Sequence, residues 1–159
     1  MNVKKRIIKA YAVFAAASLA VGGISALATR QGMKEYMSGA VKPALSPPGA
    51  VFGAVWTLLY ALMGVSAAEI WLSDDPRKWR ALTVFAVQLA VNFMWCVFFF
   101  GFALYGFAVI WLLLLLLLTV VMAAMFYRIK RGAGLLQLPY IAWLCFALYL
   151  NISVWLLNK

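Results

Sequence analysis

Residues 42–60 read KPALSPPGAVFGAVWTLLY, and this stretch joins a stiff polar segment to a long apolar one. Its prolines fix φ and cannot donate backbone hydrogen bonds, so the segment before the apolar run is predicted to be rigid and extended. Ser46 is a candidate helix N-cap, and Pro47 and Pro48 suit the first helical turn. Trp56 then lies about 13 Å along the predicted helix, deeper than the interface where membrane tryptophans usually lie. The stretch therefore predicts a rigid lid above a pocket.

The composition of the whole chain predicts an all-α integral membrane protein. Of its 159 residues, 67% are hydrophobic and only 11% are charged, and the mean hydropathy is +0.98. A soluble domain of this size could not bury so much apolar surface. Apolar runs, each near the roughly 20 residues that a helix needs to cross a bilayer, indicate a five-transmembrane-helix bundle in a single domain, 1–159. The predicted spans are 7–28, 51–72, 81–102, 104–127 and 135–157, and the connection 29–50 is the predicted pocket lid.

Several function classes are disfavoured by the residue types present. The net charge of +10 could suggest a nucleic-acid partner. We predict no nucleic-acid binding, because the basic residues form short clusters between apolar runs, where they set membrane topology. The sequence has no histidine, which removes the commonest metal ligand and general base, and no metal site is predicted. Cys96 and Cys145 fall inside apolar runs, so we expect no disulfide framework. No nucleophile or phosphate-loop motif assigns a certain catalytic residue.

The first apolar segment has two interpretations. Four basic residues between positions 4 and 9 precede an apolar run that ends in Ala-Leu-Ala at 26–28, a pattern typical of a cleaved secretory signal. Cleavage there would leave a four-helix protein. Because the run is longer than a usual signal core, we treat it as the first span.

The distribution of Lys and Arg predicts the orientation in the membrane. With five spans, the N-terminus shares a side with the second and fourth connections, and by the positive-inside rule this side is cytoplasmic and the C-terminus is outside. The predicted membrane is the bacterial cell membrane. The predicted cytoplasmic side carries Lys4, Lys5, Arg6, Lys9, Arg77, Lys78, Arg80, Arg128, Lys130 and Arg131, and the other side carries Arg30, Lys34, Lys42 and Lys159.

Aromatic and amide side chains at membrane depth repeat at helical spacing, which places them on common helix faces. Buried amides need partners, so these faces are predicted to look inward. One interpretation is that the amides only hydrogen-bond between helices, at about 0.6 kcal/mol each. The other is a pocket with aromatic walls for a flat, mostly apolar ligand, and the two can coexist. The residues on these faces are Gln88, Asn92 and Trp95; Trp143, Ala147 and Asn151; and Phe52, Trp56, Tyr60 and Met63.

Two further predictions concern the surface of the bundle. Glu69 is the only acidic residue inside a predicted span and lies beside the basic second connection, so an ion pair with Arg77 or Lys78 is predicted. Small residues at 103, 106 and 108 give a candidate face for dimerisation.

The motifs of the second, third and fifth spans resemble the TspO/MBR family, which includes the bacterial tryptophan-rich sensory protein and the mitochondrial translocator protein. The resemblance covers the chain from about Lys42 to its end. It rests on Lys42-Pro43, Pro47-Pro48-Gly49, Phe52-Gly53, Val55-Trp56, Leu59-Tyr60 and Met63-Gly64; on Gln88, Asn92, Trp95 and Phe98–Phe100; and on Leu136, Pro139-Tyr140, Trp143, Phe146-Ala147, Leu150-Asn151, Trp155 and Asn158.

The resemblance implies a five-helix bundle, often a homodimer, that binds porphyrins, sterols and synthetic isoquinoline or benzodiazepine-type ligands between its helices. Some members are reported to break down protoporphyrin under light, with tryptophans that match Trp56 and Trp143 implicated. The predicted ligand-binding residues are Tyr36, Pro47, Trp56, Tyr60, Gln88, Asn92, Trp95, Trp143, Phe146, Ala147 and Asn151.

Two departures from the family pattern bear on ligand choice. Residues 34–37 read Lys-Glu-Tyr-Met where the family has Trp-Tyr, and Ala44-Leu45 replaces an aromatic residue of the lid. In the fifth span the only basic residue after Tyr149 is Lys159, so the sterol motif of the vertebrate proteins is not matched there, and specific cholesterol binding is not predicted.

The predicted function is a membrane receptor or sensor that binds protoporphyrin IX and related hydrophobic ligands, with a regulatory role in tetrapyrrole metabolism or stress. The alternatives are a tetrapyrrole transporter, a light-dependent porphyrin-degrading protein, and a structural membrane protein without a ligand. No cofactor is required, and the predicted partners are a porphyrin or other hydrophobic small molecule, membrane lipid and a second copy in a homodimer.

Overall fold

The structure is a computed structural model that describes residues 2–159, and all regular elements in this range are helices. Within it, the segments Val3–Ala28, Gly49–Trp71, Lys78–Gly101, Tyr105–Ile129 and Arg131–Leu157 are long and apolar enough to cross a membrane. This confirms the prediction of an all-α five-span membrane bundle. The elements are α1 (Val3–Ala28), α2 (Arg30–Gly39), α3 (Gly49–Trp71), α4 (Lys78–Cys96), the π-helix η1 (Val97–Gly101), α5 (Tyr105–Ile129), α6 (Arg131–Leu135) and α7 (Leu138–Leu157).

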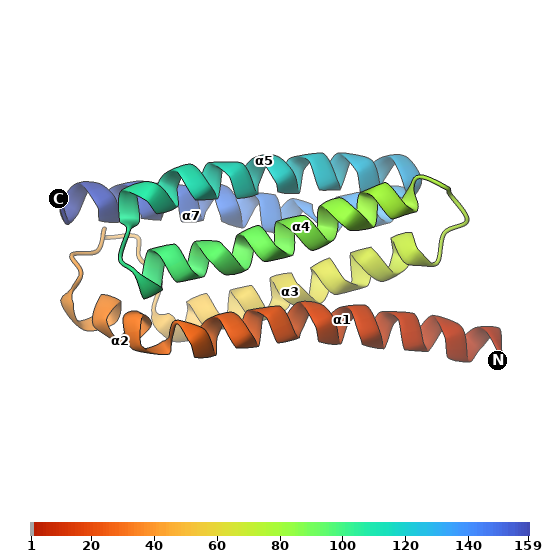
Figure 1. The fold of residues 1–159 in the computed structure, drawn as a ribbon, viewed down its shortest axis with the longest axis horizontal. Helices are drawn as coiled ribbons and strands as arrows, with labels where there is room; N and C mark the ends of the chain where they lie inside the picture. The colour runs from red at the N-terminus through yellow and green to blue at the C-terminus, as the bar shows by residue number, and fades with distance from the viewer. Residues whose placement is uncertain (1) are drawn as a thin grey trace.

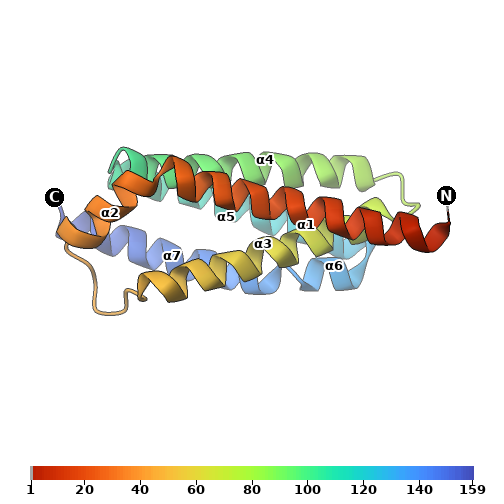
Figure 2. The same ribbon diagram turned by 90° about the horizontal axis from the view of Figure 1, so that it is seen from below.

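The long helices run alternately up and down the axis of one bundle, so the two termini lie at opposite ends (Figure 1). We call these the N-terminal end and the C-terminal end. Helix α2 and the extended segment 40–48 lie at the C-terminal end, whereas α6 lies at the N-terminal end (Figure 2). The connection between α1 and α3 therefore covers one end of the bundle only.

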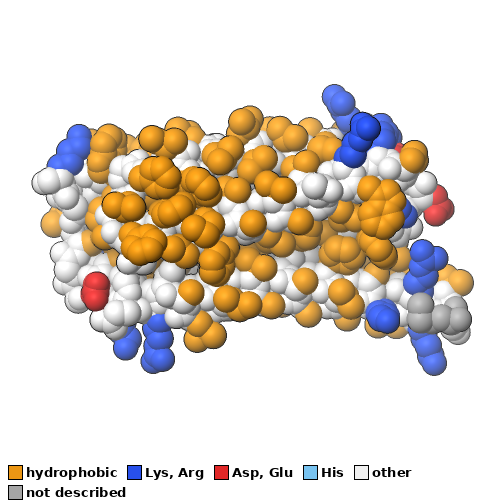
Figure 3. Space-filling model, viewed as in Figure 1, with side chains coloured by type: hydrophobic (Ala, Val, Ile, Leu, Met, Phe, Trp, Pro, Cys, Tyr) orange, Lys and Arg blue, Asp and Glu red, His pale blue; other side chains and the backbone are white. Residues whose placement is uncertain are grey.

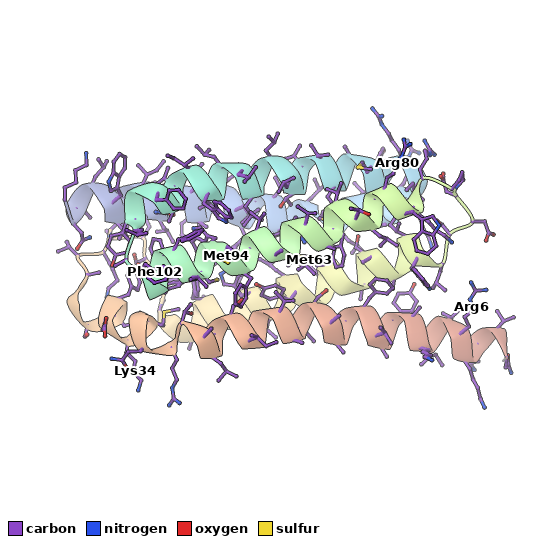
Figure 4. All side chains as sticks on the ribbon, in the orientation of Figure 1. Arg6, Lys34, Met63, Arg80, Met94 and Phe102 are labelled. Atoms are coloured by element: carbon purple, nitrogen blue, oxygen red, sulfur yellow. The ribbon has the colours of Figure 1, made fainter. Side chains whose placement is uncertain are left out.

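The surface is divided as a membrane protein requires. Hydrophobic side chains cover the middle of the visible face, and Lys and Arg gather towards the two ends (Figure 3). Arg6 and Arg80 lie at the N-terminal end and Lys34 lies near the C-terminal end (Figure 4). A charge-free band between two charged ends matches the hydrocarbon core between two headgroup layers.

Close backbone packing joins the helices near the middle and the N-terminal end. A Cβ added to Gly64 of α3 would lie 2.5 Å from the Cα of Ala15, so α1 and α3 are in backbone contact there. The Ser66 hydroxyl donates a 2.6 Å hydrogen bond to the carbonyl of Ala133 in α6. The core between α3, α4, α5 and α7 includes Met63, which is completely buried.

The N-cap of α3 lies two residues later than predicted, at Pro48, and the connection before the helix contains a helix of its own. Pro48 has extended backbone angles and is the N-cap, so Ser46 does not cap the helix and the two prolines do not lie in its first turn. The physical reason is that a residue before proline avoids helical angles, which keeps residue 47 extended. Within the predicted lid 29–50, residues Arg30–Gly39 form α2, which periodicity did not predict.

The predicted partner of Glu69 is wrong. Its carboxylate accepts a hydrogen bond from Tyr11 of α1 and forms an ion pair with Lys130 at the junction of α5 and α6. Arg77 is instead held by Asp75, two residues away, with 2.7 Å between the guanidinium and the carboxylate. These hydrogen bonds lower the pKa of Asp75 to about 2. Arg77 therefore pairs with a carboxylate two residues away in sequence. Glu69 instead connects α1 to the junction of α5 and α6.

Two of the three small residues predicted to form a dimer face pack within the chain, whereas Ala103 is exposed. Ala108 is completely buried. A Cβ added to Gly106 would lie 2.7 Å from the indole nitrogen of Trp155. This face of α5 is therefore occupied by α7 and is not free for a second copy.

Candidate ligand-binding cavity

A cavity of about 510 Å³ lies between the helices at the C-terminal end. Helices α1, α3, α4 and α7 and the π-helix η1 supply its walls, and α2 with the following segment covers it. Pockets of about 300–1,000 Å³ suit drug-sized ligands. Seven of the eleven predicted ligand-binding residues line it: Tyr36, Pro47, Trp56, Tyr60, Trp95, Ala147 and Asn151.

Trp56 is the centre of the aromatic wall. Its ring centroid lies 5.7 Å from that of Tyr60 and 6.2 Å from that of Trp95. Trp95 stacks on Phe99 of η1 at 5.4 Å. Rings at these spacings attract one another through their edges and faces. The wall is therefore a rigid, mostly apolar surface, suited to a flat ligand.

Two of the predicted amides lie behind this wall and not in it. Tyr60 donates a 2.7 Å hydrogen bond to the side-chain oxygen of Asn92, and Asn92 donates one of 2.6 Å to the Tyr140 hydroxyl. Tyr140 donates in turn to the side-chain oxygen of Gln88 at 3.1 Å, and Gln88 contacts the sulfur of Met63 at 3.5 Å. All of these side chains are buried. This series of hydrogen bonds gives the Gln88 and Asn92 amides partners inside the bundle. It agrees with the interpretation that the amides hydrogen-bond between helices.

The third predicted amide lines the cavity and is held in place. Asn151 accepts a 3.1 Å hydrogen bond from the Trp95 indole and donates one of 2.9 Å to the carbonyl of Tyr105. With both ends of the amide used, Asn151 fixes the orientation of Trp95. Its place at the cavity is therefore that of a rigid wall residue.

Trp143 and Phe146 lie beyond the cavity. The Trp143 ring packs 6.1 Å from Phe52 and 5.4 Å from Phe146, and neither residue belongs to the lining. Phe52 does line the cavity, and its ring also lies 6.2 Å from Trp56. Phe52 thus contacts both Trp143 and the Trp56 ring of the cavity wall. The indole nitrogens of Trp56 and Trp143 are buried and have no hydrogen-bond partner among the described residues.

Two contacts fix the lid to the rest of the bundle, through Asn158 and Phe100, and a third, from Lys42, lies within the lid. The Asn158 amide accepts a 2.9 Å hydrogen bond from the Val41 backbone N–H and donates one of 2.9 Å to its carbonyl. Lys42 donates a 2.6 Å hydrogen bond to the carbonyl of Met37, near the end of α2. Gly32 lies so close to the Phe100 carbonyl that a side chain there would overlap it. We call these three contacts the lid contacts.

Tyr36 of α2 provides the underside of the lid. Its ring meets those of Phe99 and Phe100 edge-on at 5.3 and 5.4 Å, and Lys42 lies 5.4 Å above it. Burial raises the pKa of the Tyr36 hydroxyl above its usual value. The hydroxyl therefore stays neutral at physiological pH, and the lid presents an aromatic face with one neutral polar group.

Sequence reasoning missed the contribution of the first span. Residues of α1 and of the start of the lid line the cavity, although none of them was predicted there. The signal was present: five of them recur at intervals of three and four, the spacing of one helix face. It was overlooked because the residues are small or apolar and carry no distinctive chemistry. They are Leu19, Gly22, Ala26, Thr29 and Met33.

The described residues contain no group of three or more His, Cys, Asp or Glu side chains that could hold a metal ion. The cavity lining includes one cysteine, Cys96, and one lysine, Lys42. The site therefore offers aromatic surface, a few neutral polar groups and a single cation, a set suited to binding a mostly apolar ligand.

The chain is similar in sequence to known proteins along most of its length. A sequence profile of the TspO/MBR family matches residues 14–156. The chain is 35% identical to the tryptophan-rich protein TspO of Archaeoglobus fulgidus over 99% of both chains. It is 32% identical to the tryptophan-rich protein TspO of Chlorobaculum tepidum, over 88% of this chain and 90% of that one. It is 34% identical to the human translocator protein, over 79% of this chain and 75% of that one.

Proposed function

Because the chain belongs to the TspO/MBR family, we propose that it is a membrane receptor for protoporphyrin IX and related flat hydrophobic molecules. The observation that supports this proposal is the cavity of about 510 Å³ beneath the lid. Its wall of stacked and edge-on rings, centred on Trp56, offers the surface that a planar aromatic ligand would contact. A regulatory role in tetrapyrrole metabolism or stress would follow from reversible occupancy of this cavity.

The residues favour a porphyrin without iron. Histidine is the proximal haem ligand of globins and peroxidases, and the sequence contains none. Lys42 is the one lysine among the lining residues, and its ammonium group could meet one propionate of the porphyrin while the macrocycle lies against the aromatic wall.

The test is a titration of the purified protein in lipid nanodiscs with protoporphyrin IX, followed by quenching of tryptophan fluorescence and by the porphyrin absorption band. We expect saturable binding with one site per chain. The matched control is Trp155→Phe, which removes an indole that is not part of the lining. Quenching that rises linearly with porphyrin in both proteins would mean partition into lipid only and would contradict the proposal.

A second candidate function is light-dependent breakdown of the bound porphyrin. The observation that favours it is the row of rings Trp56, Phe52 and Trp143, with centroids 6.2 and 6.1 Å apart, that leads away from the cavity. In this scheme dioxygen is the oxidant of the macrocycle. Illumination would bleach the porphyrin band in the wild type faster than in the Trp56→Phe variant, and no loss would occur in the dark.

We further propose the cell membrane as the location, with the N-terminal end in the cytoplasm. The support is the cluster of basic residues at that end, which includes Arg6 and Arg80 (Figure 4). Labelling of single cysteines introduced at Arg6 and Lys159, in a variant without Cys96 and Cys145, would test the orientation with a membrane-impermeant reagent. A homodimer remains part of the proposal, and its interface would have to use a face other than that of Ala108.

A further inference from the structure

The exposed part of the cavity lining is confined to one side of the bundle. The lining residues contributed by α4, η1 and α7 are all buried or half-buried. The exposed ones lie on α1, on α3 and, in the case of Met37, on α2. They include Gly23 and Ala26 of α1 and Gly53 and Thr57 of α3. We call these four residues the α1–α3 mouth.

The mouth lies between the ends of α1 and α3, two helices that are long and apolar enough to cross a membrane. Thr57 is eight residues beyond the first residue of α3, which places it about 12 Å along the helix. Gly23 is five residues before the end of α1, or about 7.5 Å along that helix. The hydrocarbon core is about 30 Å thick, so the mouth faces acyl chains in one half of the bilayer.

The glycines of the mouth differ from the packing glycines of the same two helices. A Cβ added to Gly22 would lie 2.5 Å from the Tyr60 ring, and one added to Gly64 would meet α1 backbone. In contrast, a Cβ added to Gly23 or Gly53 would meet nothing within 4 Å. Helix packing therefore does not require glycine at positions 23 and 53. The absence of a side chain there instead keeps the seam open.

The other way into the cavity is closed by polar contacts. A ligand arriving from water at the C-terminal end would have to displace the lid, which Asn158 holds through both backbone groups of Val41. It would also have to separate Gly32 of α2 from the Phe100 carbonyl, with which it is in close contact. No such bond spans the mouth, because the hydroxyl of Thr57 donates within its own helix, to Gly53.

From these observations we infer that hydrophobic ligands enter and leave the cavity sideways, from the bilayer, through the α1–α3 mouth. This inference rests on the proposed function, because it concerns the access route of the same cavity. It restricts the ligands to molecules that dissolve in the acyl region of a membrane. It also assigns Gly23 and Gly53 a role in the rate of binding that is separate from affinity.

The experiment measures association and dissociation of protoporphyrin IX in nanodiscs by stopped-flow tryptophan quenching. The variants are Gly23→Leu and Gly53→Leu, which narrow the mouth without meeting a neighbour. The matched control is Gly132→Leu, another helical glycine with nothing within 4 Å, at the N-terminal end and outside the lining. We expect about tenfold slower association in the mouth variants, with slower dissociation as well, because a barrier on the path slows movement in both directions. The control should match the wild type.

A second variant, Asn158→Ala, releases the lid without touching the mouth. Rates equal to those of the wild type would support lateral access, whereas faster association would show access through the lid and overturn the inference. Wild-type rates in both mouth variants would overturn it as well, and so would a raised Kd with unchanged association. If the wild type itself shows no saturable binding, the proposed function fails, which is a different result from normal binding at unchanged rates.

Discussion

The Tyr60 hydroxyl donates a 2.7 Å hydrogen bond to the side-chain oxygen of Asn92. This bond joins a residue that lines the cavity to one that lies behind the wall. It is the first link of the chain that continues to Tyr140 and Gln88. The cavity wall and the polar core of the bundle are therefore one connected structure, and the two can be separated by mutation.

The first prediction is that Tyr60→Phe destabilises the protein without weakening ligand binding. The phenyl ring keeps the wall, but the Asn92 oxygen loses its donor in a buried position, which costs about 1–3 kcal/mol. Thermal unfolding in detergent should show a lower midpoint. Tyr149→Phe is the matched control, because Tyr149 is 44% exposed. The unfolding temperature of this variant should equal that of the wild type. Equal stability of Tyr60→Phe and the wild type would show that the chain of hydrogen bonds contributes little.

The second prediction distinguishes Trp56 from Trp143, which the sequence analysis places in the same set of predicted ligand-binding residues. Trp56→Ala removes the centre of the wall and should weaken protoporphyrin binding by about 2 kcal/mol, or roughly thirtyfold. Trp143 does not line the cavity, so Trp143→Ala should change the Kd by less than about threefold. Titration of both variants in nanodiscs gives the comparison. A larger loss for Trp143→Ala than for Trp56→Ala would place the ligand outside the cavity described above.

How much of this site could be predicted from the sequence is clear from Gln88, Asn92 and Trp95. Helical spacing correctly puts all of them on one inward face, because the period of an α-helix is a local property. Spacing cannot say which of them meets open space. That depends on Tyr140 of another helix. Its hydroxyl is hydrogen-bonded to both Asn92 and Gln88, and neither amide belongs to the lining. The division between packing and binding residues is thus set by tertiary contacts.

The lid shows a second limit of sequence reasoning. Residues 30–39 contain two glycines and a polar, uncapped pattern, and such a segment reads as an irregular connection. It forms α2 because tertiary contacts support it: Gly32 admits the Phe100 carbonyl and Tyr36 packs on two phenylalanines. The prolines correctly predict the extended segment before α3, but the helix α2 depends on partners far away in the chain.

The third prediction concerns the ion pair at the N-terminal end. Glu69 joins Tyr11 of α1 to Lys130 at the α5–α6 junction, and Glu69→Gln removes the charge that both recognise. Because Lys130 is half exposed and solvent screens the pair, the expected loss is only about 1 kcal/mol. Thermal unfolding at low and high salt measures it, with Glu35→Gln as the exposed control. The difference between Glu69→Gln and the wild type should shrink at high salt, since screening already weakens the pair. A difference that grows with salt would contradict this account.

The fourth prediction tests the contact between α1 and α3 through two glycines of the same helix. Gly64→Ala places a Cβ 2.5 Å from the Cα of Ala15, and because backbone cannot move aside as a side chain can, α1 must shift. Overpacking of this kind typically costs about 1–3 kcal/mol. Gly53→Ala adds the same methyl group where nothing lies within 4 Å, and alanine favours helix by about 1 kcal/mol over glycine. The two substitutions should therefore move the unfolding midpoint in opposite directions, down for Gly64→Ala and up for Gly53→Ala. If both raise it, the two helices are not in backbone contact at Gly64, and the difference between packing glycines and mouth glycines, on which lateral access depends, disappears.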